Sequence, residues 1–434
     1  VQVLAHAGGA ERDPRVDLAE AETAYRLGEQ QRAAAAAARA RDWALAHGVG
    51  EIRLRAARLH AEAIARLDLR AEAQTELTRL AGEMAAAGMD REAAESRLAL
   101  GKILARTADN ARAHETLERA LAGLRAADDR SGEVGALVAL AFQGSKGGDL
   151  APSLSLAQSA VALAREIGDR WSEGEALVGC LALANWAGDA KTVLETQGLA
   201  LRALRESANR QTLLATLNNL ALGAVERLEL DRAEAYLGEA ADLSQRVGNR
   251  LADAGLDRAY GYLEESRGAH DLARQRYEAA LDKARRAEVP ISIATYLGDL
   301  AWLEVAADRP DAAADRAVEA IAAHQAVGKL GDAVELSGVL AWVEARRGNR
   351  SAAYERLAAL RHAAGEAPAA PSFSSLVLEA RIAEALGDWQ RARSELLLAR
   401  ELCAGCPEAD RLLASVLMAA DKAAEAVAPL TRLW

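Results

Sequence analysis

The sequence repeats with a period of forty residues, and this period restricts the fold more than any other feature. One complete unit runs from Asp129 to Gly168, and the next begins at Asp169. A fixed period in this range is typical of a solenoid, in which each unit packs on its neighbours. The position at the middle of each unit is usually small or turn-forming: Gly28, Asp68, Ala108, Gly148, Gly188, Leu228, Gly268, Asp308 and Gly348.

Each unit is predicted to contain two helices. The chain is rich in Ala, Leu, Glu and Arg, which favour helix, and no segment has the alternating pattern of a strand. Small residues recur seven positions before each turn, and they allow two helices to approach closely. This series, hereafter the small-residue column, is Ala21, Ala61, Gly101, Ala141, Leu181, Ala221, Gly261, Ala301 and Ala341, continued by Ala380 and Ala414.

Asp or Asn followed by Arg recurs at the start of four successive units. Such residues are good N-caps, because the side-chain oxygen accepts a hydrogen bond from a free backbone N–H of the first turn. We therefore expect helices to begin after Asp129, Asp169, Asn209 and Asn249.

The period also predicts the organisation of the chain. Residues 1–12 contain Gly8-Gly9 and no helical period, and we expect a linker there. Nine helix pairs should occupy 13–364, and two more should occupy 376–434. The intervening segment 365–375 contains two prolines and predicts a loop.

The columns resemble the tetratricopeptide repeat, whose marks are a small residue in the first helix, Gly at the turn, and Ala five and twelve residues later. Gly261, Gly268, Ala273 and Ala280 show the pattern most fully. HEAT repeats also run near forty residues, but the prolines expected inside their helices are missing here. The resemblance implies an all-α, right-handed superhelical solenoid of about eleven antiparallel helix pairs. The forty-residue period is similar to that of helical arms in bacterial signalling regulators.

Composition excludes several classes of function. A net charge of −11 argues against a nucleic-acid surface, and no apolar run is long enough to cross a bilayer. Phosphate-binding, nucleophile-elbow and zinc-protease motifs are all absent, and the seven histidines form no ligand-spaced pair, so we expect no enzyme, metal or cofactor. Because the chain begins at Val1 without Met, we expect a piece of a longer protein, and its compartment stays open.

The residue after the small-residue column faces the groove in the resembled family, where partners bind on the concave side. In this chain that position holds Phe142, Tyr262, Trp302 and Trp342, although aromatic residues are scarce. We expect an aromatic ladder on the concave face, with both tryptophans partly exposed. The alternative is that the rings pack between neighbouring pairs.

Asn218 and Asn219 lie side by side on a first helix. Asparagine amides both donate and accept, which suits them to bind a peptide backbone or carboxylate, whereas two adjacent asparagines are poor helix formers. The two interpretations are that this asparagine pair binds a partner and that it occupies an exposed position without a role in binding.

A basic run occupies the position five residues after the small-residue column. In an acidic protein this run would attract an acidic peptide, and the alternative is a solvated face. Its members are Arg26, Arg66, Arg106 and Lys146.

Cys403 and Cys406 form the one motif with potential chemistry. The pair lies at a helix end without the strand–helix–strand frame of a redox protein, and two cysteines are only half a zinc site. We expect a passive pair. Cys180 falls in a core column and should be buried.

Two functions follow from an array with no catalytic motif. The first is a scaffold that binds a protein, a peptide or another copy of itself, as an arm of a larger bacterial regulatory protein. The second is a sensor that closes on a small ligand to control an attached module. A deep pocket walled by the aromatic residues would favour the sensor, and a long open groove would favour peptide binding.

The small positions of the second helices give a first test. We expect Ala233→Leu or Ala273→Leu to overpack one pair and to destabilise the protein by about 1–3 kcal/mol. Thermal melts of the two variants measure this loss, and melts equal to the parent's would contradict the assignment of the columns.

Overall fold

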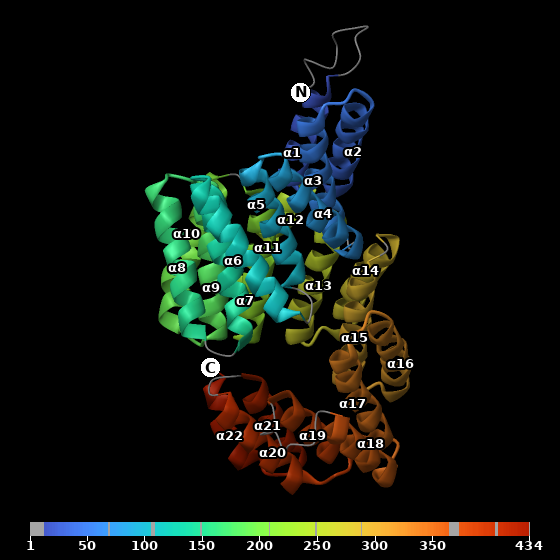
Figure 1. Ribbon diagram of the computed structural model, residues 1–434. Coiled ribbons are helices and arrows are strands. Elements are labelled where there is room, and N and C mark those ends of the chain that lie inside the picture. Colours follow the sequence, from blue (N-terminus) through green and yellow to red (C-terminus); the bar gives the residue numbers. More distant parts are fainter. Residues whose placement is uncertain are drawn as a thin grey trace. The chain divides into compact units, whose positions relative to one another are not determined.

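The computed structural model describes residues 13–67, 70–105, 109–147, 150–207, 209–247, 250–287, 289–363, 373–403 and 407–433. Within these ranges the chain is all-α, with twenty-two α-helices that pack against their sequence neighbours and no strand (Figure 1). The predicted fold class and the expected number of about eleven pairs are confirmed. The chain forms two compact units, Val1–Thr216 and Leu217–Trp434, which we call unit 1 and unit 2.

The helices of unit 1 begin with Pro14 at the first position of α1. Their bounds are α1 Pro14–Leu27, α2 Gln30–Ala46, α3 Gly50–Arg66, α4 Arg70–Ala86, α5 Asp90–Leu104, α6 Asn110–Ala126, α7 Arg130–Gly144, the 3₁₀ turn η2 Ser145–Gly147, α8 Leu150–Glu166, α9 Arg170–Trp186 and α10 Ala190–Glu206.

Helix α11, Arg210–Glu226, contains the division between the units, and the remaining helices belong to unit 2. Their bounds are α12 Leu230–Val247, α13 Arg250–Ser266, α14 His270–Arg286, α15 Pro290–Ala306, α16 Pro310–Ala326, α17 Leu330–Arg346, α18 Arg350–Ala363, α19 Phe373–Ala385, α20 Trp389–Leu402, α21 Pro407–Ala419 and α22 Ala423–Arg432. Helix α19 begins three residues before the predicted 376. The predicted linker 1–12, and 365–372 of the predicted loop, lie outside the described residues.

Close approach of the two helices at the small-residue column holds each pair together. Ala221 and Ala301 are fully buried, as are Ala233 and Ala273 on the second helices. Where the column holds glycine, the partner helix places a large side chain over it. A Cβ on Gly261 would overlap the ring of Tyr277, which is itself fully buried. The forty-residue period therefore follows from the need for a small residue where the two helices of each pair meet.

Most of the turns that the structure describes close with a glycine in the left-handed region, as the sequence predicts. Gly188, Gly268 and Gly348 have φ of 67°, 75° and 79°. Leu228 adopts the same geometry with φ of 57°. The turn is therefore retained, although a side chain with a Cβ is sterically disfavoured in this conformation.

The expected N-caps form at three of the four positions. Asp129 accepts a hydrogen bond from the N–H of Gly132 at 2.9 Å, and Asp169 and Asn209 cap their helices in the same way. Asn249 lies outside the described residues. Asp169 also accepts a hydrogen bond from the Ser131 hydroxyl at 2.7 Å, so a cap in one repeat is tied to the repeat before it.

Two glycine substitutions separate the packing role from simple helix propensity. We expect Gly261→Ala to destabilise the protein by about 1–3 kcal/mol, because the new methyl group displaces the Tyr277 ring. Gly238→Ala, whose Cβ would meet nothing within 4 Å, should instead stabilise α12 by about 0.5–1 kcal/mol. Chemical denaturation measures both, and equal effects of the two would contradict this account.

Candidate functional site

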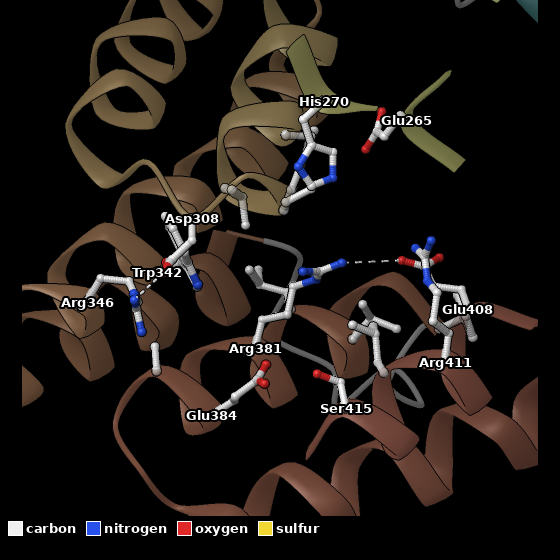
Figure 2. A pocket seen from close by; sticks show the side chains of 18 of the residues that line it. Glu265, His270, Asp308, Trp342, Arg346, Arg381, Glu384, Glu408, Arg411 and Ser415 are labelled. Atoms are coloured by element: carbon white, nitrogen blue, oxygen red, sulfur yellow. Dashed lines mark hydrogen bonds and ion pairs between the residues drawn. The ribbon is translucent and has the colours of Figure 1, made fainter. Parts of the chain in front are cut away.

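Unit 2 contains a cavity of about 670 Å³ on the inner side of its first helices. Its walls come from α13, α15, α17, α19 and α21, with contributions from the first residues of α14 and α20 (Figure 2). We call this cavity the unit 2 pocket.

The helical repeat explains which side chains reach the unit 2 pocket. Residues one and four positions after the small-residue column share a helix face, because i and i+3 lie on the same side. The first position supplies Trp302, Trp342, Arg381 and Ser415, and the fourth supplies Glu265, Val305 and Glu384.

Both tryptophans of the predicted ladder line the unit 2 pocket, and they come from neighbouring pairs. Trp302 is half-buried, but Trp342 has only 5% of its surface exposed. The expected partial exposure is therefore wrong for Trp342. The reason is that α19 packs directly on α17, with the side chain of Leu378 against Gly338.

Charged side chains, which the sequence analysis missed, make up much of the lining. Asp308 and Arg346 form an ion pair at one side of the pocket. Arg381 lies 3.9 Å from Glu408, and its guanidinium points into the cavity (Figure 2). Extending the column by one position past Ala380 would have identified Arg381.

Two carboxyl groups in the pocket are perturbed by burial. Burial raises the pKa of Glu265, and the hydrogen bond that the Tyr277 hydroxyl donates to its Oε2 at 2.8 Å opposes the shift. Burial also raises the pKa of Glu384, against the positive charges of Arg381 and Arg346. Each carboxylate therefore lacks enough compensation for its negative charge.

Tyr262, the third predicted ring of unit 2, lies in a different set of contacts. Its hydroxyl donates to Asp299 at 2.7 Å, and Asp299 also binds the guanidinium of Arg258. The Tyr262 ring contacts the edge of Tyr277 at a centroid distance of 5.6 Å. Tyr262 thus joins α13 to α15 and supports Tyr277 behind the pocket.

The asparagine pair is divided between two environments. Asn219 is exposed, whereas Asn218 is half-buried with a buried Oδ1 that has no hydrogen-bond partner among the described residues. Neither lines the unit 2 pocket. Their role in binding stays a prediction.

Phe142 lies in unit 1, whereas the other three rings of the predicted ladder belong to unit 2. It is half-buried and packs edge-on against Trp186 at 5.8 Å. Trp186 is exposed and belongs to the next repeat. This contact matches the alternative in which the ring packs between neighbouring pairs.

The basic run makes contacts within unit 1. Lys146 donates to the carbonyl oxygen of Ala105 and, at 3.2 Å, to Asn110 Oδ1 in the preceding repeat. Arg106 lies outside the described residues. Lys146 is therefore a link between repeats, and an acidic partner for the run stays a prediction.

The other two members of the run reach across unit 1. Arg66 stacks on Tyr25 at 4.5 Å and donates to Gln211 Oε1 at 3.3 Å. Arg26 lies 5.9 Å from the ring centroid of Trp171. The first two helix pairs thus contact α9 and α11, well beyond their sequence neighbours.

The cysteines follow the expectations in part. Cys180 is free and buried, and burial raises its pKa to about 11, so its thiol is unreactive at neutral pH. Cys403 is disulfide-bonded, and Cys406 lies outside the described residues.

In the described part of the chain, no three or more His, Cys, Asp or Glu side chains are grouped to hold a metal ion. None of the described helices combines the length and apolar character needed to span a membrane.

Comparisons with known proteins support the fold. No protein-family model and no curated protein matches the chain. Among solved structures, the chain is similar to a Rap protein complexed with Competence and Sporulation Factor, at 12% identity and a TM-score of 0.50, covering 73% of this chain and 99% of that one. It is also similar to aspartyl phosphate phosphatase F from Bacillus subtilis, at 13% identity and a TM-score of 0.49, covering 63% and 72%. A third is a STAND signal-transduction ATPase with a tetratricopeptide repeat sensor from Pyrococcus horikoshii, at 14% identity and a TM-score of 0.42, covering 74% and 52%.

The perturbed carboxyl group of Glu384 predicts a pH dependence of stability. Because burial raises its pKa in the folded state, the folded protein binds the extra proton, and stability is lost as the pH rises through that folded-state pKa. Glu384→Gln mimics the protonated form, so its melting temperature should increase relative to the parent's as the pH rises from 4 to 8. A difference that does not change with pH would contradict the assignment.

Proposed function

We propose that this chain, a tetratricopeptide-like repeat protein, is a non-catalytic interaction module whose unit 2 binds a short peptide in its pocket. The observation that carries the proposal is the pocket itself, a cavity of about 670 Å³ with Trp302 and Trp342 in its wall. Ligand pockets of proteins are typically ~300–1,000 Å³ with aromatic side chains and a few polar groups. In this proposal the chain acts as an arm of a larger bacterial regulatory protein.

The chemistry of the lining supports binding over catalysis. Ser415 and His270 are the pocket's hydroxyl and imidazole, and within the described ranges they make no hydrogen bond to each other. A nucleophilic serine needs an adjacent base to activate it. The pocket therefore offers contacts for a ligand and no activated nucleophile.

A protein of similar fold also holds a bound partner. The Rap protein was crystallised in complex with Competence and Sporulation Factor. We take this only as an example of what the fold accommodates, because the proposal depends on the pocket residues of this chain.

A small-ligand sensor is the second candidate, and the number of helix pairs that line the site favours it. The cavity is bounded by helices from several consecutive pairs, including α13, α17 and α21. A compact ligand would therefore contact several repeats at once and stabilise one curvature of unit 2. Such a change would reach any module attached to the chain.

Substituting the half-buried tryptophan tests the proposed pocket. We expect Trp302→Ala to weaken capture of a random heptapeptide library by about thirty-fold, equivalent to ~2 kcal/mol, with little change in melting temperature. The exposed Trp186 of unit 1, which does not line the pocket, gives the control Trp186→Ala.

Trp342→Ala should behave differently, because its ring is buried. We expect it to lower the free energy of unfolding by about 3–5 kcal/mol. If Trp302→Ala left capture unchanged, or weakened it no more than Trp186→Ala did, the pocket would not be the binding site.

A further inference from the structure

The unit 2 pocket has Glu265 on one wall, and the opposite wall carries two arginines together with the carboxylates of Glu384 and Glu408. Glu265 extends from α13 on one side, and Arg381 and Arg411 extend from α19 and α21 on the other (Figure 2). The arginines are near enough to influence Glu265 electrostatically, but no ion pair joins either of them to it within the described chain. The space between the walls is the cavity.

The acidic wall is held in place for contact with a ligand. The Tyr277 hydroxyl donates to Glu265 Oε2 at 2.8 Å, and the ring of Tyr277 is fully buried over Gly261. Glu265 Oε1 has no hydrogen-bond donor among the described residues. Since a carboxylate accepts through both oxygens, one side of Glu265 is available to a donor in the cavity.

The basic wall is also incompletely satisfied. Only 20% of the Arg381 side chain is exposed, yet its nearest carboxylate, Glu408, is 3.9 Å away, which is too far for a hydrogen bond. Arg411 forms no ion pair with any described residue. A guanidinium presents five N–H donors in a plane and binds a carboxylate with two parallel hydrogen bonds. Arg381 therefore faces the cavity with most of its donors unused, and the exposed Arg411 adds further donors that no described carboxylate occupies.

The cost of burying these charges indicates the ligand class. Burial raises the pKa of Glu265 and lowers that of Arg381, because the opposite charges near each group offset only part of the hydration that it loses. A neutral ligand would leave both walls uncompensated, and a ligand of one sign would satisfy only one of them.

We propose that the unit 2 pocket binds an amphoteric ligand, with its ammonium group on Glu265 and its carboxylate on Arg381 and Arg411. This inference rests on the proposed function and gives its ligand a chemical class. A short peptide with unblocked termini and a free amino acid share this chemistry. Trp302 and Trp342 lie beside the body of the ligand.

Blocking each terminus separately tests the proposal on the full chain. The probes are equimolar tripeptide mixtures in four forms: unblocked, N-acetylated, C-amidated and blocked at both ends. We expect the immobilised chain to retain the unblocked form at least tenfold better than either singly blocked form. N-dimethylated tripeptides, which keep the positive charge but add bulk, should be retained. A mixture of free amino acids tests whether a single amino acid, which also has an ammonium and a carboxylate group, binds in place of a peptide.

Variants assign each terminus to a wall. Glu265→Gln keeps an oxygen for Tyr277 but removes the charge, so it should abolish the preference for a free amine and leave the preference for a free carboxylate. Arg381→Gln combined with Arg411→Gln should abolish the preference for a free carboxylate and leave the preference for a free amine. With lysine in place of glutamine at position 381, part of the preference for a free carboxylate should return. The matched controls are Glu264→Gln, whose carboxylate pairs with Arg267, and Arg393→Gln, whose guanidinium pairs with Glu425. Both should bind like the parent, and circular dichroism checks that every variant folds.

The failures of the two proposals are distinguishable. If blocked and unblocked forms were retained equally and Trp302→Ala still weakened capture, the pocket would bind peptides but the amphoteric ligand would be wrong. Equal loss of both terminal preferences in Glu265→Gln would also overturn the assignment. If no form were retained and Trp302→Ala left library capture unchanged, both proposals would fail.

Discussion

Contact between small residues of paired helices is the constraint on which the rest of the structure depends. A fully buried alanine such as Ala221 or Ala301 brings the backbones of two helices close together, and Gly261 allows the ring of Tyr277 to lie directly on the first helix. Larger side chains then have room only between successive pairs. The forty-residue period is the repetition of this single steric requirement along the chain.

The same contact orients the site. When the small-residue column faces the second helix, positions one and four residues later share another face of the first helix, and several of them line the unit 2 pocket. Trp302, Arg381 and Glu265 reach one cavity for this reason, although they are far apart in sequence. Tyr277 takes part in both the packing of the helix pair and the pocket. Its ring fills the space over Gly261, and its hydroxyl holds the carboxylate of Glu265.

Periodic features could be predicted from the sequence, and features that depend on distant repeats could not. The helix pairs, the turn glycines and the Asp169 cap are local, and the structure has them where the pattern indicates. The burial of Trp342 depends on α19 packing against α17, which no local pattern reveals. Arg381 follows the column by one position and could have been found, whereas Arg411 and Glu408 lie outside the columns and reach the pocket from α21.

The contact between Arg66 and Gln211 joins residues 145 positions apart within unit 1. A solenoid whose units touch only their neighbours has low contact order and melts repeat by repeat. Unit 1 instead closes a long loop, whose entropy must be lost before the contact forms. Its first repeats are thereby coupled to its last ones, and opening at either end loosens the other. Inserting or deleting one repeat between them would change the number of repeats in the closed loop and would move Arg66 away from Gln211.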